Sequence, residues 1–371
     1  MKNDRIAHSA NLPAGRQGAI AQKILMSGNE AMAEAAIKAG CYFYAGYPIT
    51  PQNELPEYMS KRMREEHRVF IQAESELAAI NMVFGASSAG FRALTSSSSP
   101  GISLKQEGIS YLAGAQLPAV IINVMRGGPG LGNIASSQSD YFQATRGGGH
   151  GDYFTPVLAP WSVNEAARLV SLAFDFADYY RTPVLILADA IIGQMMEAVE
   201  FTSDNGFKNK LPVKDWALTG AKNRPSRIVK SFFLKEGALE AHNQRLSKKW
   251  ERIKNNEQRF SAYKTDDAKY LIVAYGSQAR IAWEAVDILR KQKIKVGLFR
   301  PISLWPYPEK NLKAIAKGIK KVLVVEQSLG QMVDDVRLSL PGKDIHFLGR
   351  TGGGIPTEDV IIKKIRSFCH R

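Results

Sequence analysis

"PAVIINVM", residues 118–125, is an apolar segment in which Asn123 is the one polar side chain. A strand with one face in water alternates apolar and polar residues, whereas a strand buried on both faces does not. "PVLILAD", residues 183–189, has the same character and follows a helical pattern at residues 163–179. Both segments are therefore predicted to be strands of a parallel sheet that helices cover on both faces.

Outward from these strands, short apolar segments alternate with helical patterns from Ser27 onward. The predicted strands lie at residues 42–45, 69–72 and 92–95, and the predicted helices at residues 29–38, 53–64, 76–88 and 102–115. This alternation is typical of a doubly wound α/β domain.

The alternation stops near Val199, where a polar connector begins that contains a charged helical pattern at residues 233–260. "KYLIVAYG", "KVGLF" and "KKVLVVEQ" then predict three further strands, with helices at residues 279–291 and 311–318. The expected fold class is α/β, with two doubly wound, mostly parallel-sheet domains. The expected organisation is an N-terminal extension (1–22), a first domain (23–199), a linker with a surface helix (200–265) and a second domain (266–371).

The net charge of +14 is concentrated in one region. Residues 204–268 hold 15 Lys/Arg and 8 Asp/Glu, and so supply +7 of it. No zinc-finger, helix-turn-helix or RNA-binding motif accompanies these basic residues, so nucleic-acid binding is not expected. The pattern favours a solvated basic surface over a docking patch for an acidic partner.

Cysteine content and hydropathy exclude several other classes. The two cysteines, Cys41 and Cys369, form no CxxC motif, which argues against an iron–sulfur cluster, a structural zinc or a disulfide framework in this chain. No segment of about 18 apolar residues is present, and the first 20 residues lack the apolar region of a secretory signal. A cytoplasmic protein without a membrane span is expected.

Four unusual loops follow consecutive predicted strands of the first domain. They are "GYPITP", "QAESE", "TSSSSPG" and "RGGPGLGNIASSQ". Ligands of open parallel sheets bind beyond the carboxyl ends of the strands, which is where these loops are expected to converge. In the first loop, Pro48 and Pro51 restrict the backbone around Thr50, so Thr50 is predicted to face a bound ligand.

The common nucleotide and hydrolase motifs are missing from these loops. The spacing of Gly128, Gly130 and Gly132 does not fit the dinucleotide fingerprint, and the sequence has neither a phosphate-binding P-loop nor a nucleophile elbow. The serines of "TSSSSPG" are instead expected to offer hydroxyl and backbone N–H donors at a helix start.

Charged candidates are found in the other loops. Glu74 and Glu76 lie at a strand-to-helix junction, where only one of them can face the site and where either could simply complement the helix dipole. Arg126 follows a buried strand and precedes glycines, so its guanidinium is expected to be accessible and to suit a substrate carboxylate. His150 in "GGGHGDY" is interpreted as an incidental loop histidine.

These motifs together resemble one family. "GNEAMAEAAIKAG", "GYPITPQNE", "TSSSSPGISLKQEGISYLAGAQLP", "RGGPGLG" and "GGGHGDY" are similar to the alpha subunit of 2-oxoacid:ferredoxin oxidoreductases. The resemblance runs from about Lys23 to the C-terminus. "VAYGSQARI" and "GLFRPISLWPYP" in the second domain resemble the transketolase C-terminal-like domain of that family.

The resemblance implies a thiamine diphosphate enzyme that decarboxylates a 2-oxoacid oxidatively, passes electrons to ferredoxin and forms an acyl-CoA from coenzyme A. It implies that Glu76 hydrogen-bonds the cofactor pyrimidine, with Glu74 as the alternative. It places Thr50 and Arg126 on the substrate side of the cofactor as further catalytic residues. The expected cofactor-binding residues are Glu76, Tyr47, Pro48, Ile49, Ser97 and Ser98.

The resemblance also implies partner subunits. The family binds the diphosphate and Mg²⁺ through a Gly-Asp-Gly motif of a beta subunit, and this chain has no such motif. [4Fe–4S] clusters are likewise expected in partner subunits, with gamma and ferredoxin-like delta subunits completing the complex. This chain alone is expected to be inactive, and to provide no metal site.

Several motifs look most like the branched-chain members, which act on 2-oxoisovalerate (3-methyl-2-oxobutanoate). The 2-oxoglutarate members share most of these motifs and remain the alternative. Two further alternatives are another thiamine-dependent, transketolase-like subunit and a non-catalytic scaffold. The joint presence of Glu76, Thr50 and Arg126 argues against the scaffold.

Overall fold

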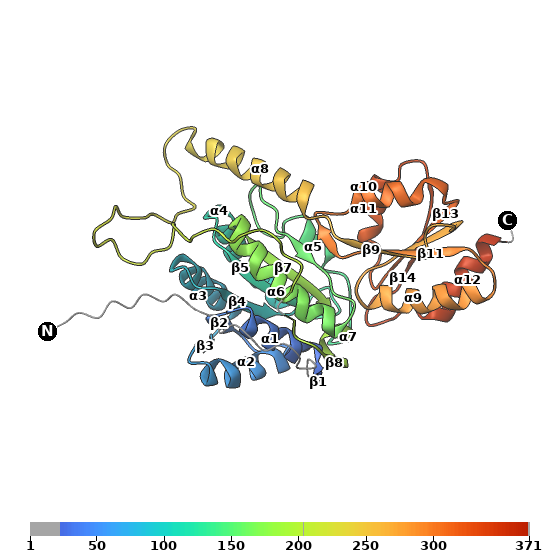
Figure 1. Ribbon diagram of the computed structural model, residues 1–371, viewed down its shortest axis with the longest axis horizontal. Helices are drawn as coiled ribbons and strands as arrows, with labels where there is room; N and C mark the ends of the chain where they lie inside the picture. Colours follow the sequence, from blue (N-terminus) through green and yellow to red (C-terminus); the bar gives the residue numbers. More distant parts are fainter. Residues whose placement is uncertain (1–22, 203, 370–371) are drawn as a thin grey trace, which may run out of the picture.

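The computed structural model describes residues 23–202 and 204–369, which form two α/β domains (Figure 1). The expected N-terminal extension, residues 1–22, lies outside the described residues. Within the described part of the chain, no helix is both long and apolar enough to cross a membrane. The α/β class with parallel-dominated sheets, expected from the sequence, is confirmed.

A seven-stranded sheet forms the centre of the first domain, with the strand order β12-β6-β7-β5-β4-β2-β3. Six of its strands, β2 to β7, are parallel to one another. Their bounds are β2 Phe43–Gly46, β3 Val69–Gln72, β4 Ala93–Ser97, β5 Ala119–Met125, β6 Val157–Leu158 and β7 Pro183–Asp189. All residues of β5 and β7 are buried, as their unbroken apolar sequences predicted.

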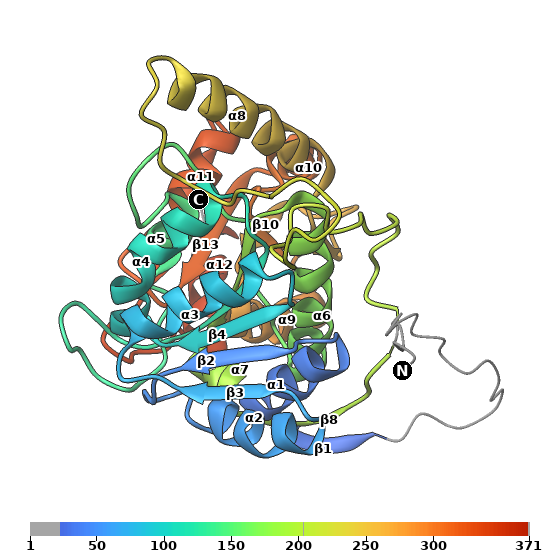
Figure 2. The same ribbon diagram turned by 90° about the vertical axis from the view of Figure 1, so that its left-hand side faces the viewer.

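Helices cover this sheet on both faces (Figure 2). One face packs against α3 (Glu76–Ser88) and α4 (Ser99–Gly114), and the other against α1 (Gly28–Lys38), α2 (Glu54–Glu65) and α6 (Val163–Tyr180). Alternate residues of β5 enter the two cores, since Ile121 belongs to the first and Val120 to the second. The strand is apolar throughout because each face has its own helix layer.

Small elements absent from the sequence prediction complete the first domain. β1 (Ile24–Ser27) and β8 (Met196–Val199) form an antiparallel two-stranded ribbon. Two five-residue helices, α5 (Tyr141–Thr145) and α7 (Ala190–Gln194), follow β5 and β7 in the chain. Elements this short carry too little periodic pattern to be recognised from sequence alone.

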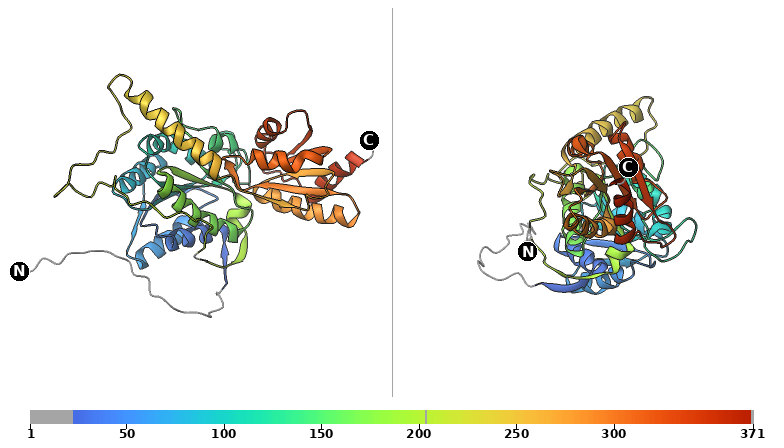
Figure 3. Two further views of the ribbon diagram at one scale, coloured as in Figure 1. Left: turned by 45° about the horizontal axis from the view of Figure 1, so that its top comes forward. Right: turned by 90° about the vertical axis from the view of Figure 1, so that its right-hand side faces the viewer.

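The surface helix of the linker is α8 (Ala238–Asn256), shorter at both ends than the predicted span 233–260 (Figure 3). It begins after Gly237, which has a φ of +71°, a conformation that favours glycine. Leu246, Trp250 and Ile253 form its buried stripe, and His242 Nε2 is 2.8 Å from the backbone oxygen of Gly114. The linker helix is therefore attached to the first domain rather than solvated on all sides.

The second domain has a five-stranded sheet with the order β14-β13-β10-β11-β9. Its strands are β9 Phe260–Tyr263, β10 Tyr270–Val273, β11 Val296–Pro301, β13 Lys321–Glu326 and β14 Asp344–Gly349, all parallel to their neighbours except β9. Its helices are α9 Gly276–Lys291, α10 Glu309–Ile315 with the short 3-10 turn Ala316–Gly318, α11 Met332–Ser339 and α12 Glu358–Cys369. The sequence analysis predicted neither β9, β14, α11 nor α12.

One strand from the second-domain part of the sequence belongs to the sheet of the first domain. The organisation expected from the sequence did not include such an exchange. β12 (Ser303–Trp305) follows the second-domain strand β11 but pairs antiparallel with β6 and so becomes the edge of the first-domain sheet. Next to this crossing, the Arg300 guanidinium donates to both carboxylate oxygens of Glu165, at 2.7 and 2.9 Å, and both side chains are buried. The domains are therefore joined by a strand and by a buried ion pair.

Arg300→Met is expected to destabilise the chain by about 3–5 kcal/mol, because it leaves the Glu165 carboxylate buried without its bidentate partner. Urea unfolding with matched controls measures the loss. Arg337→Met, which breaks the exposed Arg337–Asp334 pair, should cost less than about 1 kcal/mol. Equal costs for the two variants would show that the buried pair does not join the domains energetically.

Candidate active site

The turn that follows β2 is held from two other elements. The side-chain amide of Asn29, in α1, donates to the backbone oxygen of Pro51 at 2.8 Å. The guanidinium Nη1 of Arg126, after β5, donates to the backbone oxygen of Thr50 at 2.9 Å. Two successive carbonyl groups are thus fixed by side chains that are distant in sequence, so the position of Thr50 does not depend on the prolines alone.

A buried polar chain lies directly beneath the same turn. The Ser96 hydroxyl donates to Gln52 Oε1 at 2.6 Å and is 2.8 Å from the Tyr44 hydroxyl, and all three side chains are buried. The sequence analysis did not select these residues. The available signal was weak, because Gln52 lies within the quoted turn but has no motif of its own.

The predicted residues of the turn differ in exposure. Thr50 and Ile49 are half-buried, whereas Pro48 and Tyr47 are exposed, Tyr47 to 39%. The Thr50 hydroxyl oxygen accepts a hydrogen bond of 3.4 Å from the Asn53 side chain. Thr50 therefore has a fixed backbone and remains partly exposed to solvent.

The structure distinguishes the two glutamates that follow β3. Helix α3 begins at Glu76, and the hydroxyl of its N-cap, Ser75, accepts from the Ala78 amide at 3.1 Å. Glu76 is 6% exposed, whereas Glu74, before the cap, is exposed. Because the chain turns at Ser75, Glu76 alone of the two is directed into the protein, toward α4.

Glu76 lies against the first turn of α4 at a position where only glycine fits. A Cβ atom on Gly101 would lie 2.5 Å from Glu76 Oε1 and 2.1 Å from Ser97 Oγ. The hydroxyls of Ser97 and Ser98 are buried and have no hydrogen-bond partner among the described residues. Buried polar groups normally have partners, so these two hydroxyls fit a polar ligand bound beside Glu76.

A buried lysine, Lys105, shares this region and was missed by the sequence analysis. Lys105 is 0% exposed, and its Nζ donates to Thr95 Oγ1 at 2.8 Å. Burial lowers the pKa of Lys105 to about 7, and the negative charge of Glu76 acts in the opposite direction. Its spacing of four residues from Gly101 on one helix was the sequence signal that could have revealed it.

Arg126 differs from the expectation of an accessible guanidinium. The residue is 7% exposed, and Nη1 and Nη2 donate to the backbone oxygens of Thr50 and of Leu131, the latter at 3.1 Å. Its Nε is buried without a partner among the described residues. The glycines after Arg126 let the loop fold back over the guanidinium instead of leaving it open, so that part of the prediction is wrong.

His150 lies apart from these residues. It is exposed, its backbone oxygen accepts from the Ser110 hydroxyl at 2.7 Å, and its ring makes an edge contact with Tyr111. Its neighbours are at the C-terminal half of α4, whereas Glu76 lies against the first turn of that helix.

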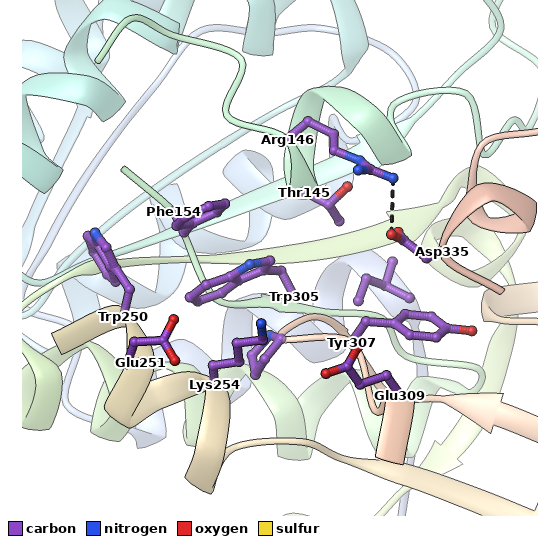
Figure 4. Close-up of a pocket in the computed structure, with 12 residues that line it drawn as sticks. Thr145, Arg146, Phe154, Trp250, Glu251, Lys254, Trp305, Tyr307, Glu309 and Asp335 are labelled. Carbon is purple, nitrogen blue, oxygen red and sulfur yellow. Dashed lines mark hydrogen bonds and ion pairs between the residues drawn. The ribbon is translucent and has the colours of Figure 1, made fainter. Parts of the chain in front are cut away.

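A separate cavity of 270 Å³ lies between the first domain, α8 and the β12–α10 region (Figure 4). Phe154 stacks on Trp305 at 4.9 Å between ring centroids, and Arg146 pairs with Asp335 at 3.0 Å. None of the predicted site residues lines this cavity. The candidate active site is instead the carboxyl edge of the first-domain sheet, where the turn with Thr50 follows β2, Glu76 follows β3 and the two serines lie at the end of β4.

A parallel sheet with a buried glutamate at a helix start and unpaired hydroxyls beside it defines a cofactor-binding domain, and the comparisons give its class. Residues 34–258 match the family described as "Pyruvate flavodoxin/ferredoxin oxidoreductase, thiamine diP-bdg". Residues 268–361 match "Pyruvate:ferredoxin oxidoreductase core domain II". The chain belongs to the 2-oxoacid:ferredoxin oxidoreductase family.

Two curated relatives cover almost the whole chain. The ketoisovalerate oxidoreductase subunit VorB of Methanothermobacter marburgensis is 46% identical over 93% of this chain and 97% of its own length. The 2-oxoglutarate synthase subunit KorA of Methanothermobacter thermautotrophicus is 34% identical over 93% of this chain and 98% of its own length. The resemblance derived from the sequence motifs is thus confirmed.

Solved structures show the same fold. The 2-oxoglutarate:ferredoxin oxidoreductase of Magnetococcus marinus matches with a TM-score of 0.83 and 24% identity, over 93% of this chain and 65% of that chain. A split-gene transketolase matches with a TM-score of 0.57 and 14% identity, over 92% of this chain and 97% of that chain. At these identities the likeness concerns the fold alone.

Arg126→Met is expected to destabilise the chain by about 1–3 kcal/mol, because the carbonyl groups of Thr50 and Leu131 lose their donors. Thr50→Val keeps the backbone and should change stability by less than about 0.5 kcal/mol. Urea unfolding of both variants measures the difference. A larger loss in Thr50→Val than in Arg126→Met would mean that the turn is held mainly through the threonine hydroxyl.

Proposed function

We propose that this chain provides the pyrimidine-binding half of a thiamine diphosphate site in an oxidoreductase that oxidatively decarboxylates 3-methyl-2-oxobutanoate or a related branched-chain 2-oxoacid. Coenzyme A would accept the acyl group and ferredoxin the electrons. The higher identity to a ketoisovalerate oxidoreductase subunit, 46% against 34% for a 2-oxoglutarate synthase subunit, supports the branched-chain substrate. 2-Oxoglutarate is the second candidate, because KorA relatives match over the same share of the chain.

The observation that carries this proposal is the environment of Glu76. Its carboxylate is buried at a helix start, with Gly101 making room for it and two unpaired serine hydroxyls nearby. Thiamine diphosphate, when bound, supplies the electron sink for the loss of carbon dioxide from a 2-oxoacid. In this proposal Glu76 exchanges a proton with the pyrimidine ring nitrogen, and Ser97 and Ser98 supply hydroxyl groups to the cofactor.

The turn after β2 would present the substrate-side groups. Tyr47, Pro48 and Ile49 form its rim, and the Thr50 hydroxyl would align the keto oxygen of the 2-oxoacid. Arg126 acts first by holding the Thr50 carbonyl. Each of its Nη atoms has a second N–H, so pairing with the substrate carboxylate stays a prediction.

The partner proposals rest on what this chain lacks. Its curated relatives are named as subunits of oxidoreductases, which supports a hetero-oligomer. Because the sequence has no Gly-Asp-Gly motif, we assign the diphosphate and Mg²⁺ to a beta subunit. The [4Fe–4S] clusters would belong to partner subunits, with gamma and delta subunits completing a cytoplasmic complex. The proposed domain limits remain residues 23–199 and 266–371, joined by residues 200–265.

Glu76→Ala is expected to lower kcat/KM of the reconstituted complex by about 10²–10⁴-fold, the typical range for loss of a proton-transfer group. Glu74→Ala is the matched control and should keep nearly full activity, because Glu74 is exposed. Assembly is checked by size-exclusion chromatography of each variant complex. Loss of activity in Glu74→Ala with retention in Glu76→Ala would transfer the role to Glu74.

The substrate assignment is tested by assaying the purified multi-subunit complex with a panel of 2-oxoacids, using a viologen dye or ferredoxin as electron acceptor. 3-Methyl-2-oxobutanoate should give the highest kcat/KM. A higher kcat/KM with 2-oxoglutarate would overturn the branched-chain assignment but leave the reaction class unchanged. No 2-oxoacid-dependent reduction by the assembled complex would overturn the reaction class itself.

A further inference from the structure

Lys105 lies on the face of α4 that packs against α3. A Cβ on Gly101 would meet Glu76, and a Cβ on Gly108 would meet the Ile80 side chain at 2.5 Å. Residues 101, 105 and 108 share one helix face, as do Glu76 and Ile80 on α3. Lys105 therefore lies in the α3–α4 interface, between the Gly101–Glu76 contact and the Gly108–Ile80 contact.

Strand β4 contributes polar side chains to the same interface. Thr95 and Ser97 are two residues apart and point to one face of the strand. Ser97 Oγ lies at the Gly101–Glu76 contact, and Thr95 Oγ1 accepts from Lys105 Nζ. Both residues are fully buried, so β4, α3 and α4 enclose a polar row that begins at Glu76 and ends at Lys105.

A buried ammonium group is costly unless an opposite charge compensates for it. An ammonium has three N–H donors, and Thr95 is the one hydrogen-bond partner of Lys105 in the described part of the chain. Glu76 is the one titratable group there whose charge acts on Lys105. Neither the Lys105 amine nor the Glu76 carboxylate is therefore electrostatically independent of the other.

We propose that Lys105 is the charge partner of Glu76, a positioning residue that holds this carboxylate at the first turn of α4, beside Ser97 Oγ, in the position proposed to face the cofactor. The part of the inference that concerns the cofactor rests on the proposed function. The electrostatic part concerns the two side chains alone and is tested on the full chain without cofactor.

The pH range in which this interaction is expected follows from the pKa of Lys105. Because the pKa of Lys105 is lowered from 10.5 to about 7, the unfolded chain binds more protons than the folded chain between these values, and this residue makes stability rise with pH there. Its attraction to Glu76 acts in the opposite sense: it is present below about pH 7, where the amine is protonated, and is lost above. A pair measurement at pH 6 and pH 9 separates the two effects.

The test is a double-mutant cycle of Lys105→Met and Glu76→Gln, with unfolding measured in urea at both pH values. At pH 6, Glu76→Gln should lower the folding equilibrium constant about tenfold more in the wild-type background than in the Lys105→Met background. At pH 9 this difference should fall below about twofold. Lys105→Gln, which keeps a polar terminus near Thr95, is run in parallel in case the methionine variant does not fold.

Lys249 provides the matched control, since it is a half-buried lysine whose pKa is lowered to about 7 by desolvation, with Arg181 rather than Glu76 as its charged neighbour. The cycle of Lys249→Met with Glu76→Gln should show no coupling at either pH. A Lys105–Glu76 coupling below twofold at pH 6, or one equal to that of Lys249, would overturn the proposal.

The cofactor part has its own readout, the Kd of thiamine diphosphate for the reconstituted complex. Lys105→Met should change this Kd at least fivefold at pH 6 and less than twofold at pH 9, while Lys249→Met changes it at neither pH. Coupling in the full chain with an unchanged Kd would overturn the cofactor-directed role. Loss of the proposed function itself would instead be seen as full activity of Glu76→Ala.

Discussion

The close approach of α4 to α3 at Gly101 is the constraint on which the site depends. At this position a Cβ atom would overlap Glu76 Oε1 and Ser97 Oγ, so glycine lets these two side chains occupy the space beside α4. The contact buries the Glu76 carboxylate while its helix start remains at the carboxyl edge of the sheet. A larger residue at 101 would force the Glu76 and Ser97 side chains out of these positions.

The other side of the cleft depends on hydrogen bonds to backbone oxygens. Asn29 from α1 and Arg126 from the end of β5 hold successive carbonyl groups of the turn after β2. Because these donors come from one helix layer and from the centre of the sheet, the turn is fixed to both parts of the domain. This arrangement gives Arg126 a structural task, so its loss is expected to lower stability whether or not it also contacts substrate.

The second domain contributes to the first through β12 and the buried Arg300–Glu165 pair. The backbone N–H of Gln138, in the loop after β5, also donates to the backbone oxygen of Gln327, after β13, at 2.9 Å. The glycine-rich loop after Arg126 is therefore connected to the second domain.

The sequence by itself determined the α/β class, the buried strands β5 and β7 and the turn that carries Thr50, because unbroken apolar runs and Xaa-Pro bonds are local signals. The family followed from motifs in loops after strands and in the helices α1 and α4. Only the tertiary structure showed that Glu76 is buried and Glu74 exposed, covered the Arg126 guanidinium and buried Lys105 against Thr95. Each of these features depends on which surfaces pack together. Contacts between residues distant in sequence set the direction of a side chain at a helix start. They also set the path of a glycine-rich loop and the burial of a helix face. The strand β12 was missed for the same reason, since its partner lies in another domain.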